Sequence, residues 1–118
     1  MMQRILIAAT LALAACGAVR AEVPDLGGTA WLATNDTCLI DEIDFASDGT
    51  ATAYDMFADD EGTGHWTLDG ENLTVDYDDW YGGIEGTVSA KRLEAVETWR
   101  SEKTKEVHHD PCIFELDE

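Results

Sequence analysis

The chain has 118 residues, of which 45% are hydrophobic, so it is long enough for one domain with a core and too short for several. Its formal net charge is −18, from 25 acidic and 7 basic residues. A surface of that sign repels nucleic acid, which we therefore exclude as a partner. The acidic residues are spread over many expected strands and turns, a pattern typical of a solvated surface.

Residues 1–21 are typical of an export signal. Arg4 supplies a positive charge, and the apolar run ILIAATLALAA over residues 5–15 is shorter than the roughly 20 residues that cross a bilayer. Leu13–Cys16 (LAAC) resembles the lipobox of bacterial lipoproteins, in which the cysteine is lipidated. Val19–Ala21 also fits ordinary cleavage after Ala21, which would remove Cys16. We favour lipidation of Cys16, and both endings predict an exported domain.

These signals predict that the domain is located in the bacterial cell envelope. With Cys16 lipidated, the domain is held at the membrane by its anchor and faces the periplasm; with ordinary cleavage, it is secreted to the periplasm. Cys38 and Cys112 then remain, and two cysteines in an exported domain are most often paired. We expect a disulfide between them, with two free thiols or a metal pair as the alternatives.

The first half of the chain predicts three strands after a tether over residues 22–28. The first strand covers residues 29–34 with Trp31 inward, and the second covers 39–46 with Leu39, Ile43 and Phe45 inward. Asp41 would share that inward face, which is either a flaw in the pattern or a sign that the strand begins late. Ser47-Asp48-Gly49-Thr50 predicts a hairpin turn into a third strand over residues 50–57, and residues 58–64 predict a polar loop.

The stretch from residue 64 to residue 96 shows the clearest side-chain period of two, over strands joined by short turns with Asp and Gly. It predicts one common interior made by Trp66, Leu68, Leu73, Val75, Tyr77, Ile84 and Val88. The next strands predict two further inward sets: Leu93, Ala95 and Trp99, then Cys112, Phe114 and Leu116. Together these patterns predict an all-β domain over residues 29–118. We expect a small antiparallel meander of seven or eight strands, in a barrel or a strongly curved sheet.

A resemblance supports this fold. Phe45–Thr50 (FASDGT), the pattern from Gly64 to Val75 (GHWTLDGENLTV) and Gly86-Thr87-Val88 resemble the turn and packing motifs of small bacterial lipocalin-like domains, over most of residues 28–116. The resemblance implies a domain that binds an apolar ligand, inhibits an enzyme or has no assigned role. The load of acidic residues departs from that pattern, and the many aromatic side chains leave little interior space.

Catalytic and metal sites are not indicated by the sequence. The cluster Asp59–Glu61 lacks the spacing of a calcium loop, and the adjacent residues His108 and His109 would point to opposite faces of a strand. We therefore predict no catalytic residues, no metal site and no cofactor. Trp80 and Tyr81 lie in a turn with two glycines, and they are either a contact site at a loop tip or, for Trp80, a lid over one end of the barrel.

Two functions of different class remain. The first is a non-enzymatic binding or interaction module for an apolar small molecule or a protein. The second is an envelope enzyme or an enzyme inhibitor that uses the acidic loops.

Overall fold

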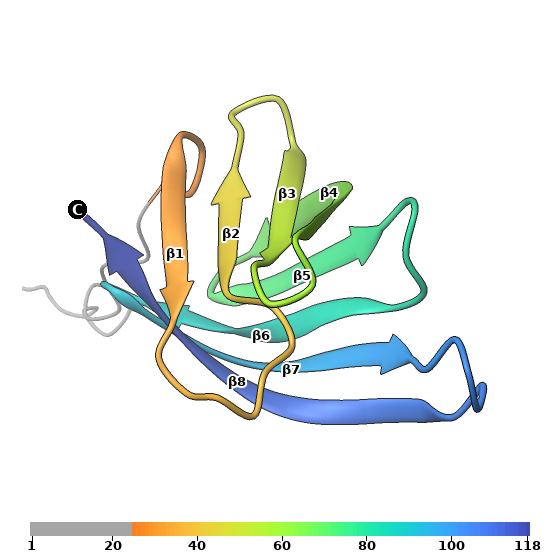
Figure 1. The fold of residues 1–118 in the computed structure, drawn as a ribbon. Helices are drawn as coiled ribbons and strands as arrows, with labels where there is room; N and C mark the ends of the chain where they lie inside the picture. Colours follow the sequence, from red (N-terminus) through yellow and green to blue (C-terminus); the bar gives the residue numbers. More distant parts are fainter. Residues whose placement is uncertain (1–24) are drawn as a thin grey trace, which may run out of the picture.

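The computed structural model describes residues 25–118 as an all-β domain of eight antiparallel strands. Each strand pairs with the next along the chain, and the first pairs with the last, so the sheet closes into a barrel (Figure 1). The expected meander is confirmed, and of the two expected shapes it is the barrel. The strands are β1 (Thr29–Ala33), β2 (Glu42–Phe45), β3 (Thr50–Asp55), β4 (Asp60–Asp69), β5 (Asn72–Tyr77), β6 (Gly83–Ser89), β7 (Arg92–Arg100) and β8 (Val107–Asp117). Within the described residues, no helix has the length and apolar character needed to cross a membrane.

The interior of the barrel is filled by side chains that alternate along the strands. In the central stretch, Val75 is paired with Trp66 on one side and with Ile84 on the other, so all three share one face. Trp66 is half-buried against the core, and its ring N–H donates to the carbonyl of Ala46 at 3.0 Å. The predicted common interior is confirmed: Leu73, Val75, Ile84 and Val88 are buried, and Trp66, Leu68 and Tyr77 pack against them.

The second strand starts later than residue 39. Leu39 is 39% exposed and Ile40 is fully buried, so the prediction that Leu39 faces inward is wrong. The side chain of Asp41 accepts a hydrogen bond from the backbone N–H of Met56 at 2.7 Å, which ties residues 34–41 down as a loop. The alternative that the strand begins late, at Glu42, is therefore the correct one.

The boundary between the third and fourth strands is also displaced. β3 ends at Asp55 rather than at residue 57, where Phe57 is fully exposed. The predicted loop over residues 58–64 is wrong from Asp60 onward, since β4 begins there. The inward residues of β4 within this predicted loop are Gly62 and Gly64, which look like loop residues in a sequence. The Trp80 ring fills the position that a Cβ on Gly62 would occupy. Position 62 therefore requires glycine because of a side chain that lies elsewhere in the sequence.

The two ends of the barrel differ in how the strands are joined. At the base, the chain enters through residues 25–28 and turns at 46–49, 70–71 and 90–91. At the mouth the loops span residues 34–41, 56–59, 78–82 and 101–106; three of them are longer than any base turn, and 56–59 equals the longest one. The β5–β6 and β7–β8 hairpins extend together toward the mouth, on the right of Figure 1. At the base, Leu26 lies in the range predicted as a tether, yet it is 1% exposed and packs in the core. The packed part of the chain therefore includes residues before 29.

Candidate functional site: the mouth of the barrel

The inward-facing side chains change from apolar to polar along three strands as these approach the mouth. The change follows directly from the sequence, because a strand presents every second residue to the interior. It places carboxyl and phenol groups at the mouth ends of these inward series, after the apolar core residues. The inward series are Ala51, Ala53 and Asp55 on β3; Leu73, Val75 and Tyr77 on β5; and Leu93, Ala95 and Glu97 on β7.

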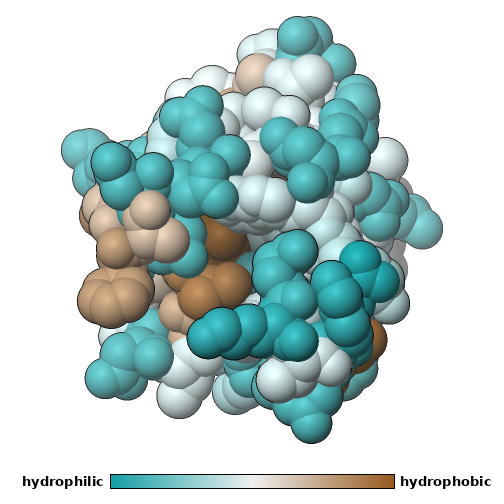
Figure 2. All heavy atoms as spheres, turned by 45° about the vertical axis from the view of Figure 1, so that its right-hand side comes forward, coloured by the Kyte–Doolittle hydropathy of each residue, from teal (hydrophilic) through white to brown (hydrophobic). Residues whose placement is uncertain are grey.

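Above this polar layer the mouth is hollowed into a cavity of about 410 Å³, which we call the cup. Figure 2, turned so that the mouth hairpins come forward, shows recessed hydrophobic surface bordered by hydrophilic residues. Four elements of the mouth contribute to the cup: the β1–β2 loop and the three hairpins β3–β4, β5–β6 and β7–β8. The lining residues are the aromatic Tyr77, Trp80, Tyr81 and Trp99; the acidic Asp55, Asp60, Asp79, Glu97 and Glu102; and Leu39 and Arg100.

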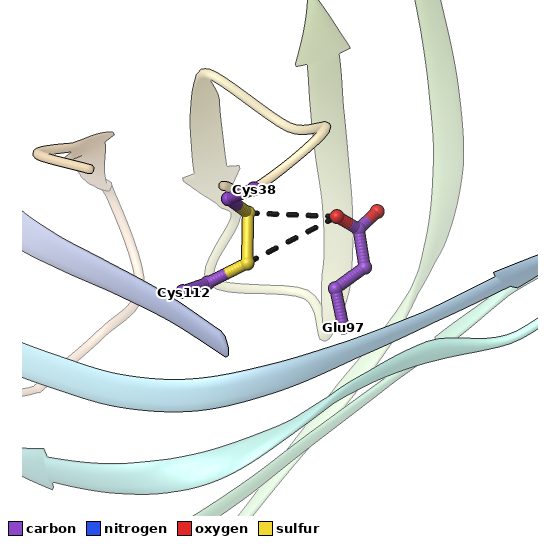
Figure 3. A group of neighbouring side chains, drawn as sticks. All are labelled: Cys38, Glu97 and Cys112. Atoms are coloured by element: carbon purple, nitrogen blue, oxygen red, sulfur yellow. Dashed lines mark hydrogen bonds between the residues drawn. A yellow bond between two sulfur atoms is a disulfide. The ribbon is translucent and has the colours of Figure 1, made fainter. Parts of the chain in front are cut away.

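Glu97 is the most deeply buried of the acidic lining residues, with 1% of its surface exposed. Its Oε1 accepts a hydrogen bond from the backbone N–H of Leu39 at 3.2 Å, and its Oε2 lies 3.5 Å from the hydroxyl of Tyr77, a long contact. The same Oε1 lies 3.4 Å from Sγ of Cys38 and 4.0 Å from Sγ of Cys112 (Figure 3). Because disulfide sulfurs carry no hydrogen, these two contacts are hydrogen bonds only when the Glu97 carboxyl is protonated and donates.

Burial raises the pKa of Glu97 to about 7, and hydrogen bonds from the backbone N–H groups of Leu39 and Ile40 oppose that rise only in part. The pKa of Tyr77 is also raised, by burial first and then by the charge of Glu97. At neutral pH the Glu97 carboxyl therefore takes up or gives up a proton readily, while Tyr77 stays a neutral hydroxyl.

The predicted disulfide is present between Cys38, in the β1–β2 loop, and Cys112, on β8. It closes the mouth on the side where β1 meets β8. Cys38, Glu97 and Cys112 also form a group of potential metal ligands within 4.8 Å of one another, but in the disulfide neither sulfur is a thiolate. Cys38 and Cys112 therefore form a disulfide, which we call the clasp, next to the buried carboxyl group of Glu97.

Trp80 folds over the mouth, and Tyr81 lies further out. The Trp80 ring packs edge-on against Tyr77, with centroids 5.3 Å apart, and covers Gly62. Tyr81 is exposed, and the guanidinium of Arg100 lies 4.6 Å from its ring centroid. Both residues line the cup, so the structure brings the predicted contact residues together there; their contact role stays a prediction.

The opposite wall of the cup is fixed by contacts between β7 and β8. Trp99 stacks on His108, with centroids 4.4 Å apart, and its ring N–H donates to Asp110 at 2.7 Å. His109, the neighbour of His108, instead contacts the hydroxyl of Thr98 at 3.0 Å on the other face of the hairpin. These two contacts therefore hold Trp99 in one orientation.

A second acidic group lies on the outer wall of the barrel, away from the cup. Glu42 and Asp44 are successive outward residues of β2, and a hydrogen bond between their side chains, with burial, raises the pKa of Glu42 to about 7. Oδ1 of Asp44 is buried without a hydrogen-bond partner.

Glu97 is a residue of the candidate site that the sequence interpretation missed. The signal was available, since Glu97 stands two residues after Ala95 and two before Trp99, both predicted to face inward. The predicted lipidation of Cys16, the predicted signal over residues 1–21 and the first part of the predicted tether lie outside the described residues. Comparison with protein families, with curated proteins and with solved structures finds no match for this chain.

Proposed function

We propose that this domain is a non-enzymatic binding module of the bacterial cell envelope, and that its cup holds a small molecule with an apolar body. The observation that carries the proposal is the cavity of about 410 Å³ between four aromatic side chains at one open end of the barrel. Small-molecule sites are concave, have volumes of roughly 300–1,000 Å³ and combine apolar walls with a few polar groups.

The cup is a better candidate than the centre of the barrel. The centre is occupied by large side chains, among them Trp31, Phe45 and Phe114, each at most 2% exposed. Trp80 and Trp99, in contrast, pack on other side chains and still line open space. Aromatic rings that are already fixed lose little conformational entropy when a ligand packs on them, which favours binding.

A neutral fluorescent probe tests the proposal. We expect N-phenyl-1-naphthylamine to increase its emission on binding and to accept energy from the tryptophans of the cup. Leu39→Trp fills the cup and should reduce that signal by about tenfold or more. Leu32→Trp is the matched control, because Leu32 is 38% exposed against 39% for Leu39 and does not line the cup. Equal signals from the two variants would place the probe elsewhere and end the proposal.

The envelope location is proposed from Leu13–Cys16 (LAAC), and a disulfide, which persists mainly in oxidising compartments, supports it. Cys16→Ser should release the protein from the membrane fraction or block its processing. Mass spectrometry that finds an unmodified mature N-terminus at Glu22 would instead support secretion to the periplasm.

A further inference from the structure

Three carboxylates of the cup lack cationic partners, whereas Glu102 at its rim lies 4.0 Å from Lys105. Within residues 25–118, none of the ion pairs engages Asp55, Asp60 or Glu97. The one cationic side chain among the lining residues is Arg100, and its guanidinium lies over the ring of Tyr81. The cup therefore presents excess negative charge to whatever enters it.

Two of these carboxylates face each other across a pair of strands. Asp55, at the end of β3, is paired directly with Asp60, at the start of β4. Like charges at directly opposed positions destabilise a sheet, and the repulsion is strongest where water is scarce. Asp55 is only 8% exposed, and its Oδ1 accepts a single hydrogen bond here, from the backbone N–H of Ala58 at 3.1 Å. A cation placed between the two carboxylates would remove the repulsion.

Glu97 adds a third acidic group at the floor. It stands in an inward series that is otherwise apolar up to that point, and burying an ionised carboxylate is costly even though it accepts hydrogen bonds from the Leu39 and Ile40 N–H groups. Its hydrogen bond to the Leu39 N–H positions the β1–β2 loop, but a neutral glutamine at this position could accept the same bond. The loop alone thus does not account for an acidic residue at this depth.

The walls favour an organic cation over a bare metal ion. Tyr77, Trp80 and Trp99 surround the space with ring surface, and cations are attracted to the faces of such rings. A hard metal ion needs several oxygens converging on one point, whereas these carboxylates come from separate strands around an aromatic cavity. An ammonium group on an apolar body satisfies both features at once.

We infer that the cup binds a small organic cation: a protonated amine whose ammonium group lies among Asp55, Asp60 and Glu97 and whose apolar body packs on Tyr77, Trp80 and Trp99. The inference rests on the proposed function and specifies its ligand by charge. The ligand is small, because the cup of about 410 Å³ stands near the lower limit of small-molecule sites.

The test compares three compounds of similar shape and different charge: 2-phenylethylamine, 2-phenylethanol and phenylacetate. Titrations of the whole domain are followed by tryptophan fluorescence and calorimetry. They are carried out at about pH 8, because Glu97 is mostly ionised at that pH. We expect the amine to bind about tenfold tighter than the alcohol, and the acid not to bind measurably. Equal binding of amine and alcohol overturns the cation inference and leaves the proposed function standing. No binding of these compounds or of the neutral probe overturns both.

Two variants on one strand separate the cup from the overall negative surface. Asp60→Asn removes a charge at the mouth end of β4, and Asp69→Asn removes one at its base end; both residues are exposed. Asp60→Asn should weaken amine binding several-fold more than alcohol binding, while Asp69→Asn should change neither. Equal weakening by both variants would assign the effect to general surface charge and overturn the inference. Circular dichroism confirms that each variant is folded.

Discussion

The base and the mouth of this barrel are built on the same eight strands, yet they differ in their connections and in their inward side chains. The base has short turns and is sealed by apolar side chains, Leu26 among them. The mouth has longer loops and carries Glu97 and Asp55 at inward positions. The contrast indicates that the base supplies stability and that the mouth gives up part of it for a cavity, as is common where proteins bind ligands.

The largest expected effect comes from placing a charge in the sealed part of the interior. Val75→Asp should unfold the domain, because Val75 is buried between Trp66 and Ile84 and total stability is only about 5–15 kcal/mol. Thr74→Asp, one residue away on the outer face, should leave the domain folded. Circular dichroism and melting curves compare the two variants. If Val75→Asp stayed folded and Thr74→Asp unfolded, the assignment of the inward and outward faces of β5 would be wrong.

Removing the clasp at the mouth should have the next largest effect. The disulfide joins Cys38 and Cys112 across a sequence separation of 74 residues, and loss of such a bridge costs about 4 kcal/mol. Urea unfolding of the double variant Cys38→Ala/Cys112→Ala measures that loss. Hydrogen exchange should then show faster opening of the β1–β2 loop and of β8 near the mouth than of the base turns. Uniformly faster exchange would contradict the separation of the two ends.

Truncating one leucine at each end compares the two ends directly. Leu26→Ala should cost roughly 3 kcal/mol, because it leaves a cavity in the sealed base. Leu39→Ala at the mouth should cost less than about 1 kcal/mol, since its side chain is partly in water already. Denaturant titrations give both values, and similar costs at the two ends would refute the idea of a sealed base and an open mouth.

The smallest expected effect is a pH-dependent gain from Glu97→Gln. The pKa of Glu97 is raised from 4.5 to about 7, so the folded domain binds more protons than the unfolded chain between those values. This group therefore makes the domain less stable as pH rises from about 5 to about 8, by roughly 2 kcal/mol. Glu97→Gln should melt higher than the parent at about pH 8 and equally at about pH 5. A difference that is the same at both pH values would point to an altered hydrogen bond instead.

Local patterns predicted the strands of this domain well, and the reason is visible in the turns. Asp48-Gly49 and Asp69-Gly70 both mark real turns at the base, and both glycines have positive φ, 94° and 64°. Between such turns, burial follows the period of two from Leu73 to Val88. Short connections leave the chain few choices, so a local pattern is enough there.

The mouth was harder to predict because it depends on contacts between distant residues. Gly62 pairs with Ala53 of β3 and leaves room for the ring of Trp80, and no property of residues 58–64 reveals either contact. Glu97 is buried because of the Leu39 N–H and the disulfide, which the β1–β2 loop and β8 bring together. A cavity formed by several hairpins likewise has no signature in any one of them.

The pairing of β1 with β8 has a consequence for how the chain folds. Ala30 lies opposite Asp117, so the contact that closes the barrel joins the two ends of the domain. Hairpins between neighbouring strands need only local encounters, but this seam requires a loop of nearly the whole domain to close, which is slow. We therefore expect the hairpin pairings to form before the seam and the Cys38–Cys112 bond, and a nascent chain to stay an open sheet until residues 107–117 have been made.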